Sequence, residues 1–524
     1  MAAIILSLTF IWIVVILGLP TLAESGNVLV IAQDTDTWLD MRTMVDKIQQ
    51  NGHEIVLVIP RNMMDMGSFE GITVKMYSAP LLKSGLSINL EPISGQSLMD
   101  SLLSAINTEY KRMKYTASVL SCTCLDLLAD QELLSFLEKR RFDVSVMDPF
   151  FPCGPILAKH LQLRSIYFLP SLPCGWDKKA ANCPNSDHSN LGNNQEDIFQ
   201  RMRNVLFHIL ETLACQQIET EYNRLASKFL HRDVKLLEIF SQAELWLYKY
   251  DFVLESAKPL MPNMLFIGGH SCPEKKRANP DFEKLVNSSG DHGFVVFSLG
   301  SMVSEIPIHK AMDIAEALRS IPQTVIWRYT GPVPSNLGEN THLVKWLPQN
   351  DLLAHPKARA FITHAGSHGI YEGICNAVPM VMLPLFGDQM DNAKRIESRG
   401  GGITLNVLDL IPEDLSNALT SVINNSSYKE NIQRLSDLHL DRPIHPLDLA
   451  VHWVEFVMRH KGAPHLRPAA HDLNWIQYHS IDVFAFLFAV LVTSLFISIK
   501  CCAFTLRCCC RRKSSKGKSK SKKE

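Results

Sequence analysis

Short apolar runs alternate with amphipathic segments along most of the chain, a pattern typical of strand–helix units that build a parallel sheet. In the first half, this pattern predicts strands at residues 27–32, 55–59, 142–148 and 165–169, with helices at 38–50 and 154–161. The intervening segments are predicted as a loop at 33–37, a helix-leaning region at 60–140, a long polar loop at 174–200 and helix at 201–245.

The second half repeats this pattern after residues 256–291, which are rich in Pro, Gly and polar residues and are interpreted as a linker. Strands are predicted at 293–298, 324–328, 360–363, 379–385 and 402–405, and helices at 309–318, 370–376, from 391, and at 447–460. Two Rossmann-like α/β domains that face a cleft are therefore expected, at residues 24–255 and 292–445. Residues 446–480 are expected to form C-terminal helices and a membrane-proximal segment.

Two longer apolar segments predict the membrane topology. Residues 3–22 are almost continuously hydrophobic and end in small residues, so residues 1–23 are expected to be a signal peptide. Residues 481–504 are long and apolar enough to cross a bilayer as one transmembrane helix. Lys and Arg residues follow this span, and the positive-inside rule therefore places the tail in the cytosol. The chain is expected to be a single-pass type I membrane protein with a lumenal body.

The net charge of −1 conceals a basic C-terminal tail. Residues 505–524 contain nine Lys or Arg and one Glu, which gives the tail +8 and the remainder of the chain −9. A basic run beside a span is typical of a segment that lies against an acidic membrane surface. The body has no basic stripe with interleaved aromatic residues, so nucleic-acid binding is not expected.

Short motifs refine the expected location. Three glycosylation sequons, at Asn287, Asn424 and Asn425, agree with translocation into a lumen. Lys520 and Lys522 lie at −5 and −3 from the carboxyl end, which resembles a dilysine retrieval signal and favours the endoplasmic reticulum membrane. Five of the 13 Cys lie in or beside the tail, where palmitoylation occurs, and the pairing of the other eight cannot be deduced.

The chemistry-bearing residues concentrate in residues 346–389, where a predicted strand leads through a turn of small residues at 364–369 into a helix. Small residues let a phosphate approach the backbone N–H groups at the helix start, and ligands of parallel sheets bind at the carboxyl ends of strands. A metal site is an alternative, because His364, His368 and Glu372 recur every four residues. Gly366 and Gly369 argue against it, since they place His364 before the helix.

This stretch closely resembles the donor-site motif of the UDP-glycosyltransferases, whose two-domain fold is called GT-B. Over a wider part of the chain, the sequence is similar to the vertebrate UDP-glucuronosyltransferases, family 1 in particular. It is carried by SLGSMVSEIP, VIWRYTG, VKWLPQNDLLAHP, FITHAGSHGIYE and PMVMLPLFGDQMDNAKR, and more loosely by FDVSVMDPFFPCGPILAKHL in the first half. The resemblance implies a UDP-sugar co-substrate and a small lipophilic acceptor, with no metal or other cofactor. It leaves open whether the chain forms homo- or hetero-oligomers with related transferases.

The resemblance also implies donor-binding roles. Trp346 would stack on uracil, Gln349 would bond the nucleotide, and Glu372 would accept from the ribose hydroxyls. Asp388 and Gln389 would bind sugar hydroxyls. The pyrophosphate and the nucleotide would receive further contacts from His364, Gly366, Ser367, His368, Ser301 and Arg328.

The implied reaction is inverting transfer of a sugar from UDP to an acceptor nucleophile. The family's base is a His in the first strand–helix loop, oriented by an Asp, and Asp148 matches that Asp. Thr37 stands where the His is expected, and a Thr hydroxyl cannot act as a base at neutral pH. Three hypotheses follow: amine acceptors that need no base, direct use of Asp148 or Asp36 for acidic acceptors, or a weakly active partner subunit that binds the donor.

The sugar itself is indicated by Lys249, which follows Trp-Leu-Tyr where the glucuronosyltransferases have an Arg. Its positive charge favours UDP-glucuronate, with UDP-glucose or another UDP-sugar as the alternative, although Lys lacks the bidentate fork of Arg. Transfer of glucuronic acid to amines, phenols, alcohols or carboxylic acids is therefore the expected function. A single-pass receptor or a lipid-binding lumenal protein would not need the residues concentrated at 346–389.

Overall fold

The computed structural model describes residues 25–33, 35–61, 69–79, 121, 123–170, 172–183, 198–255, 257–270, 272, 280–300, 303–385, 388–407 and 409–515. The predicted signal peptide and Ser301 lie outside these residues. The chain divides into two compact units, Met1–Leu466 and Arg467–Glu524.

The first sheet is built from seven parallel strands of the described chain, in the order β3-β2-β1-β4-β5-β6-β7. The strands are β1 (Asn27–Ile31), β2 (Glu54–Pro60), β3 (Thr73–Tyr77), β4 (Val144–Met147), β5 (Ser165–Leu169), β6 (Ala243–Tyr248) and β7 (Met264–Phe266). The helices are α2 (Thr35–Gln50), α5 (Gln131–Lys139), α6 (Cys153–His160), η1 (Pro173–Gly175), α7 (Trp176–Ala180), α8 (Ile198–Leu230) and α9 (Leu236–Phe240).

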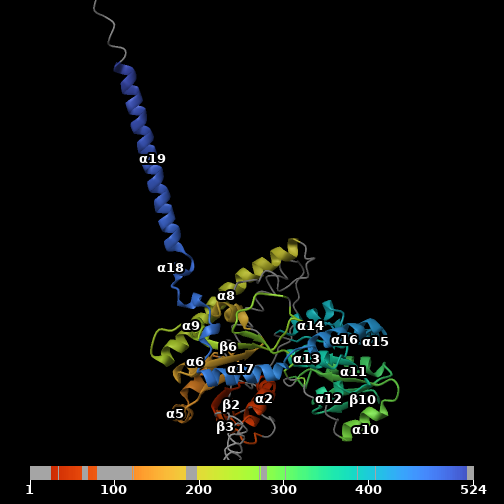
Figure 1. The fold of residues 1–524 in the computed structure, drawn as a ribbon. Helices are drawn as coiled ribbons and strands as arrows, with labels where there is room; N and C mark the ends of the chain where they lie inside the picture. Colours follow the sequence, from red (N-terminus) through yellow and green to blue (C-terminus); the bar gives the residue numbers. More distant parts are fainter. Residues whose placement is uncertain are drawn as a thin grey trace, which may run out of the picture. The chain divides into compact units, whose positions relative to one another are not determined.

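Alternate residues of these strands point to opposite faces of the sheet, and each face is covered by helices. Val28 and Val30 of β1 pack against α2 and α17 (Pro446–His460), whereas Leu29 and Ile31 pack on the face covered by α5, α6, α7 and α9. Figure 1 shows α17 alongside the strands of the first sheet, although its sequence follows the second. The last helix of the unit therefore completes the core of the first domain.

The second sheet contains six parallel strands among the described residues, in the order β10-β9-β8-β11-β12-β13. The strands are β8 (Phe294–Ser298), β9 (Thr324–Arg328), β10 (Thr341–Val344), β11 (Ala358–Thr363), β12 (Met380–Met382) and β13 (Gly402–Thr404). One face packs against α11 (Ile308–Arg319) and α15 (Pro412–Asn424). The other packs against α10 (Pro280–Ser288), α12 (Gln349–Leu353), α13 (Ser367–Cys375), α14 (Gln389–Ser398) and α16 (Ser426–Leu440).

The expected pair of Rossmann-like α/β domains is confirmed, and several local expectations are wrong. Strands β3, β6, β7 and β10 lie where helix, linker or no element was expected. Strands β3, β7 and β10 lack a long apolar run because they are short or half-exposed, whereas the buried β6 directly follows helical sequence and was expected to continue it. The predicted linker contains β7 and α10, and the predicted loop at 174–200 contains α7. Helix α2 begins at Thr35, so Thr37 lies in its first turn and not in a loop.

The second unit contains η4 (Ala469–Asp472), α18 (Trp475–Tyr478) and α19 (Ile481–Ser515). Residues Ile481–Cys508 of α19 are apolar and long enough to cross a membrane, which agrees with the predicted span at 481–504. The helix continues beyond the predicted end of that span into the basic tail.

Disulfides are present, although their pairing could not be deduced from the sequence. The described residues form three: Cys124–Cys153, Cys174–Cys215 and Cys272–Cys375. The third joins the segment after β7 to the end of α13. The sequon residues Asn287, Asn424 and Asn425 are exposed, as glycosylation would require.

Candidate active site

The strand order of both sheets positions the candidate site. In the first sheet β1 lies between β2 and β4, and in the second β8 lies between β9 and β11. At such a point the connections leave in opposite directions, and ligands of open α/β sheets bind there, at the carboxyl ends of the strands. The segments that follow β1 and β4 carry Thr37 and Asp148, and those that follow β8 and β11 carry Gly300 and His364.

Helix α13 begins at this point of the second sheet and offers its N-terminus. Gly366 occupies the N-cap position without a side-chain cap, and Ser367 is the first helical residue. The backbone N–H groups of the first turn therefore remain as donors, and the helix dipole favours negative charge beside them. This combination is a phosphate-binding arrangement.

His364 lies beside the helix start, wedged between two glycines. A Cβ at Gly300 would come within 2.7 Å of the imidazole, and one at Gly366 within 2.5 Å of its Nε2, so a side chain at either position would displace the ring. Burial lowers the pKa of His364 to about 4, and the imidazole is therefore neutral at neutral pH. Its Nδ1 has no hydrogen-bond partner among the described residues, which leaves it available to a ligand.

Glu372 is buried on α13 and is shared by two neighbours. Gln349, the first residue of α12, donates its amide to one carboxylate oxygen, and His368 Nε2 lies 3.3 Å from the other. Burial acts to lower the pKa of His368, but Glu372 and Asp40 outweigh it and raise the pKa well above 6.5. His368 is therefore an imidazolium cation held between two carboxylates.

Trp346 presents an exposed flat surface near this helix. Its side chain is 60% exposed, and the Arg328 guanidinium lies over the ring, 5.3 Å from the centroid. Arg328 also donates to the carbonyl of Gly300, in the turn after β8. The indole is thus held beside the site with one face open for stacking.

Asp388 and Gln389, at the start of α14, are held by protein partners. Asp388 accepts hydrogen bonds from the Tyr250 hydroxyl at 2.8 Å and from the Asn392 amide at 2.9 Å. The Gln389 side chain is buried, and its carbonyl accepts from the backbone N–H of Leu385 at 2.8 Å. Both side chains are therefore fixed in position next to the turn after β12.

The first domain contributes Thr37, Asp148 and Lys249. Thr37 is buried in the first turn of α2, and Asp148 directly follows β4, the neighbour of β1. Lys249 directly follows β6, and its ammonium donates to Asp40. Burial acts to lower the pKa of Lys249, but Asp40, Asp148 and Asp388 outweigh it and raise the pKa.

Asp40 is the residue that sequence reasoning missed. Its carboxylate bonds Lys249 and lies 2.7 Å from His368 Nδ1, and its backbone carbonyl lies 2.8 Å from His270 Nε2. The sequence could have pointed to Asp40 through its spacing, because it lies three residues after Thr37 and therefore on the same face of α2. Asp40 therefore connects the first domain to α13 of the second domain within the site.

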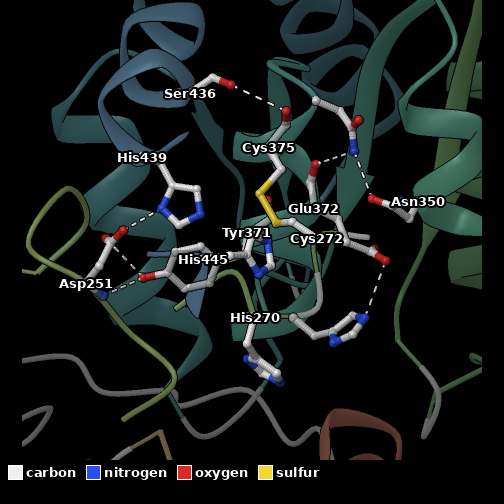
Figure 2. The surroundings of a disulfide bond; sticks show 12 residues. Asp251, His270, Cys272, Asn350, Tyr371, Glu372, Cys375, Ser436, His439 and His445 are labelled. Carbon is white, nitrogen blue, oxygen red and sulfur yellow. Dashed lines mark hydrogen bonds and ion pairs between the residues drawn. A yellow bond between two sulfur atoms is a disulfide. The ribbon is translucent and has the colours of Figure 1, made fainter. Parts of the chain in front are cut away.

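The rear of α13 is supported by a buried polar cluster (Figure 2). The Tyr371 hydroxyl accepts from the backbone N–H of Asp251 at 2.8 Å. The Asp251 carboxylate also binds His439 of α16 and Arg442, which follows that helix. Figure 2 shows the side chains of Asp251, Tyr371 and His439 facing one another beside the Cys272–Cys375 disulfide. The cluster joins the chain after β6 to two helices of the second domain.

The helix face that the alternative metal site would need is not formed. His364 precedes α13, so it does not share a helix face with His368 and Glu372. The donor atoms of Cys272, Cys375 and His439 lie within 4.8 Å of one another, but the two sulfurs are bonded to each other.

Comparison with curated proteins shows close relatives over nearly the whole chain. UDP-glucuronosyltransferase 1A1 of Mus musculus is 52% identical over 503 residues, covering 94% of this chain and 93% of the relative. UDP-glucuronosyltransferase 1A1 of Homo sapiens is 51% identical, covering 94% of each chain. UDP-glucuronosyltransferase 1A4 of Homo sapiens is 49% identical, covering 96% of this chain and 95% of the relative.

Solved structures support the fold. The calicheamicin glycosyltransferase CalG4 matches with a TM-score of 0.56 and 18% identity, over 83% of this chain and 99% of that one. Os79 from O. sativa in complex with UDP matches with a TM-score of 0.54 and 16% identity, over 82% of this chain and all, 100%, of that one. A family model described as UDP-glucoronosyl and UDP-glucosyl transferase matches residues 26–516. The chain therefore belongs to the UDP-glucoronosyl and UDP-glucosyl transferase family and is a glycosyltransferase with the GT-B fold.

Proposed function

We propose that the protein transfers glucuronic acid, with inversion, from UDP-glucuronate to small lipophilic amines, phenols, alcohols or carboxylic acids. The observation that carries the proposal is the convergence at the start of α13 of uncapped N–H groups, the neutral His364, the Glu372–Gln349 pair and the exposed Trp346. The relatives are UDP-glucuronosyltransferases, which supports glucuronate as the sugar. The products would be β-glucuronides, which are polar forms suited to clearance.

The donor would lie along the second domain. Uracil would stack on Trp346, and the ribose hydroxyls would donate to Glu372, which Gln349 already orients. The pyrophosphate would take the N–H groups at Gly366, Ser367 and His368, together with His364. Asp388 and Gln389 would bind the sugar hydroxyls, with Arg328 and Ser301 near the nucleotide.

The acceptor would attack the anomeric carbon from the face opposite UDP, from the side of Thr37 and Asp148. UDP would leave with the bonding electron pair, and the helix start with the His368 cation would stabilise the charge that develops on it. The proposal needs no metal ion. With Thr37 in place of a base, amine nucleophiles are the favoured class, since their lone pair attacks without loss of a proton.

The proposed location is the endoplasmic reticulum membrane, with the catalytic part in the lumen and the tail in the cytosol. The apolar α19, the basic residues that follow it and the spacing of Lys520 and Lys522 support this placement. Another UDP-sugar is the alternative donor, because Lys249 stands where the resemblance expects Arg. A donor-binding partner subunit is the alternative role, because of Thr37.

The proposal is tested by incubating membranes that contain the full chain with UDP-glucuronate or UDP-glucose and a mixture of amine and phenol acceptors. Mass spectrometry is expected to find glucuronides as the main products. Glucosides alone would establish the alternative donor. No conjugate of any kind, together with stabilisation of the protein by UDP, would establish a donor-binding partner subunit.

Replacement of Trp346 with Ala is expected to weaken UDP binding by about tenfold, since base–aromatic stacking contributes about 1–3 kcal/mol. Trp346→Phe should retain most of the affinity. The measurement is titration calorimetry with UDP. Trp475→Ala is the matched control, because Trp475 is 68% exposed in the second unit; an equal loss in both variants would contradict the stacking role.

Replacement of Lys249 with Ala is expected to lower kcat/KM for UDP-glucuronate by about tenfold or more, the magnitude of a lost hydrogen bond to a charged group. The use of UDP-glucose should change far less, because glucose has no carboxylate. Lys159→Ala on α6 is the control, since that side chain bonds Gln242 at the surface. Equal losses with both donors would remove Lys249 from sugar selection.

A further inference from the structure

Asp40 joins three parts of the protein in one buried contact. Its side chain is 8% exposed, bonds the ammonium of Lys249 from β6, and lies 2.7 Å from His368 Nδ1 on α13. Burial acts to raise the pKa of Asp40, but Lys249 and His368 outweigh it and hold the pKa below its usual range. The carboxylate is therefore ionised and has two cationic partners.

Negative groups of the proposed donor, UDP-glucuronate, would interact with both of these cations. The pyrophosphate at the start of α13 would lie beside the His368 cation, and the sugar carboxylate would bind Lys249, which already faces Asp148 and Asp388 as well as Asp40. Asp40 then shares its cations with three further negative charges of the donor. A further cation beside this buried carboxylate would therefore offset the added negative charge.

The position of Asp40 shows where that cation would come from. Thr37 and Asp40 lie three residues apart on α2, so their side chains project from the same face of the helix. Thr37 marks the place at which the acceptor nucleophile is expected. An acceptor nitrogen beside Thr37 is therefore within reach of the Asp40 carboxylate.

We propose that Asp40 is an acceptor-binding catalytic residue, whose carboxylate supplies the counter-charge for amine acceptors; this rests on the proposed function. A tertiary amine uses its lone pair to form the bond to the anomeric carbon, while the bond from that carbon to the UDP oxygen breaks and UDP leaves with the electron pair. The nitrogen becomes a quaternary ammonium and no proton moves. Asp40 stabilises the positive charge as it develops.

A phenol acceptor develops no positive charge, and the same carboxylate opposes the phenolate that phenols form. Asp40 therefore determines acceptor class. Its effect is expected on the ratio of amine to phenol turnover and not on transfer in general.

The first test compares kcat/KM for one tertiary amine and one phenol, with UDP-glucuronate and the full chain in membranes. Asp40→Asn is expected to lower the ratio of the amine value to the phenol value by about 100-fold, the magnitude of losing one group that stabilises transition-state charge. Asp46→Asn, which removes a partly exposed carboxylate paired with Arg42 on the same helix, is the control. Equal losses with both acceptors would overturn the proposal, because they would indicate only a structural contact.

The second test measures binding and needs no enzymatic activity. It compares the native protein with two variants, so it does not rest on the folding of one variant alone. Benzyltrimethylammonium and its neutral isostere neopentylbenzene are titrated into the UDP-saturated, detergent-solubilised full chain. The native protein and Asp40→Glu are expected to bind the cation at least about tenfold more tightly than the isostere, through attraction between unit charges, and Asp40→Asn is expected to lose this preference. Equal affinity in the native protein, or an unchanged preference in Asp40→Asn, would overturn the proposal.

Measurements on the native protein distinguish failure of the proposed function from failure of the proposed role of Asp40. If UDP does not bind and no glucuronide forms from any acceptor, both the proposed function and the role of Asp40 are overturned. If UDP binds and phenols are glucuronidated without any cation preference, only the role of Asp40 is overturned.

Discussion

Replacement of Thr37 with His is expected to raise turnover of phenol acceptors by about 100-fold, the usual contribution of a positioned general base. Thr37 lies in the first turn of α2, and Asp148 follows β4, which pairs directly with β1. A new imidazole at position 37 would therefore have a carboxylate nearby to orient it. Tertiary amines should change little, since their lone pair needs no base. The measurement is the initial rate with each acceptor class and UDP-glucuronate.

The control is Thr43→His, which places the same side chain on the same helix but away from the Thr37 face. Adding Asp148→Asn to Thr37→His should remove the gain if that carboxylate orients the imidazole. High native phenol activity without a gain would support direct use of a carboxylate as base. No activity in either form would favour a partner subunit that binds the donor without turnover.

Replacement of Asp251 with Ala is expected to destabilise the protein by about 3–5 kcal/mol, because removal of one partner leaves buried charged and polar groups uncompensated. The Asp251 carboxylate binds His439 and Arg442 at the end of α16, and the Tyr371 hydroxyl lies 3.3 Å from it. The loss would loosen α13 from its support as well as lower global stability. The measurement is denaturant unfolding of the solubilised protein, followed by fluorescence.

Asp46→Ala is the matched control for Asp251, since the Asp46–Arg42 pair is 3.6 Å long and lies at the surface of α2. Surface pairs of this kind contribute about 0–1 kcal/mol. If Asp251→Ala unfolds at the same denaturant concentration as the control, the cluster in Figure 2 does not hold the domains together.

Much of the fold could be predicted because strands buried on both faces leave continuous apolar runs. Strand β5 was predicted with its observed bounds, Ser165–Leu169, and β9 with Thr324–Arg328. Strand β3 could not be predicted, because its residues are mostly half-exposed or exposed and resemble a polar loop. The early start of α2 was missed because Thr and Asp favour turns and caps as readily as the first turn of a helix.

The residues proposed to bind the donor could be predicted as a group because they follow one another in the chain. Residues 346–389 pass through the ends of two strands and the start of α13, so a local pattern describes their placement. The residues proposed to bind the acceptor could not be predicted to the same extent. Asp40 was missed because its importance depends on Lys249 and His368, which are 209 and 328 residues away.

The sequence by itself determined the α/β class, the two sheets, the C-terminal apolar helix and the donor motif, since each depends on periodicity or on residues close together in the chain. The tertiary structure alone decided three further features: the disulfide pairs, the support of α13 by Asp251, and the position of Asp40 between Lys249 and His368. The physical reason is that contacts between distant residues form only when the sheets and helices pack together. Such contacts leave no periodic trace in the sequence.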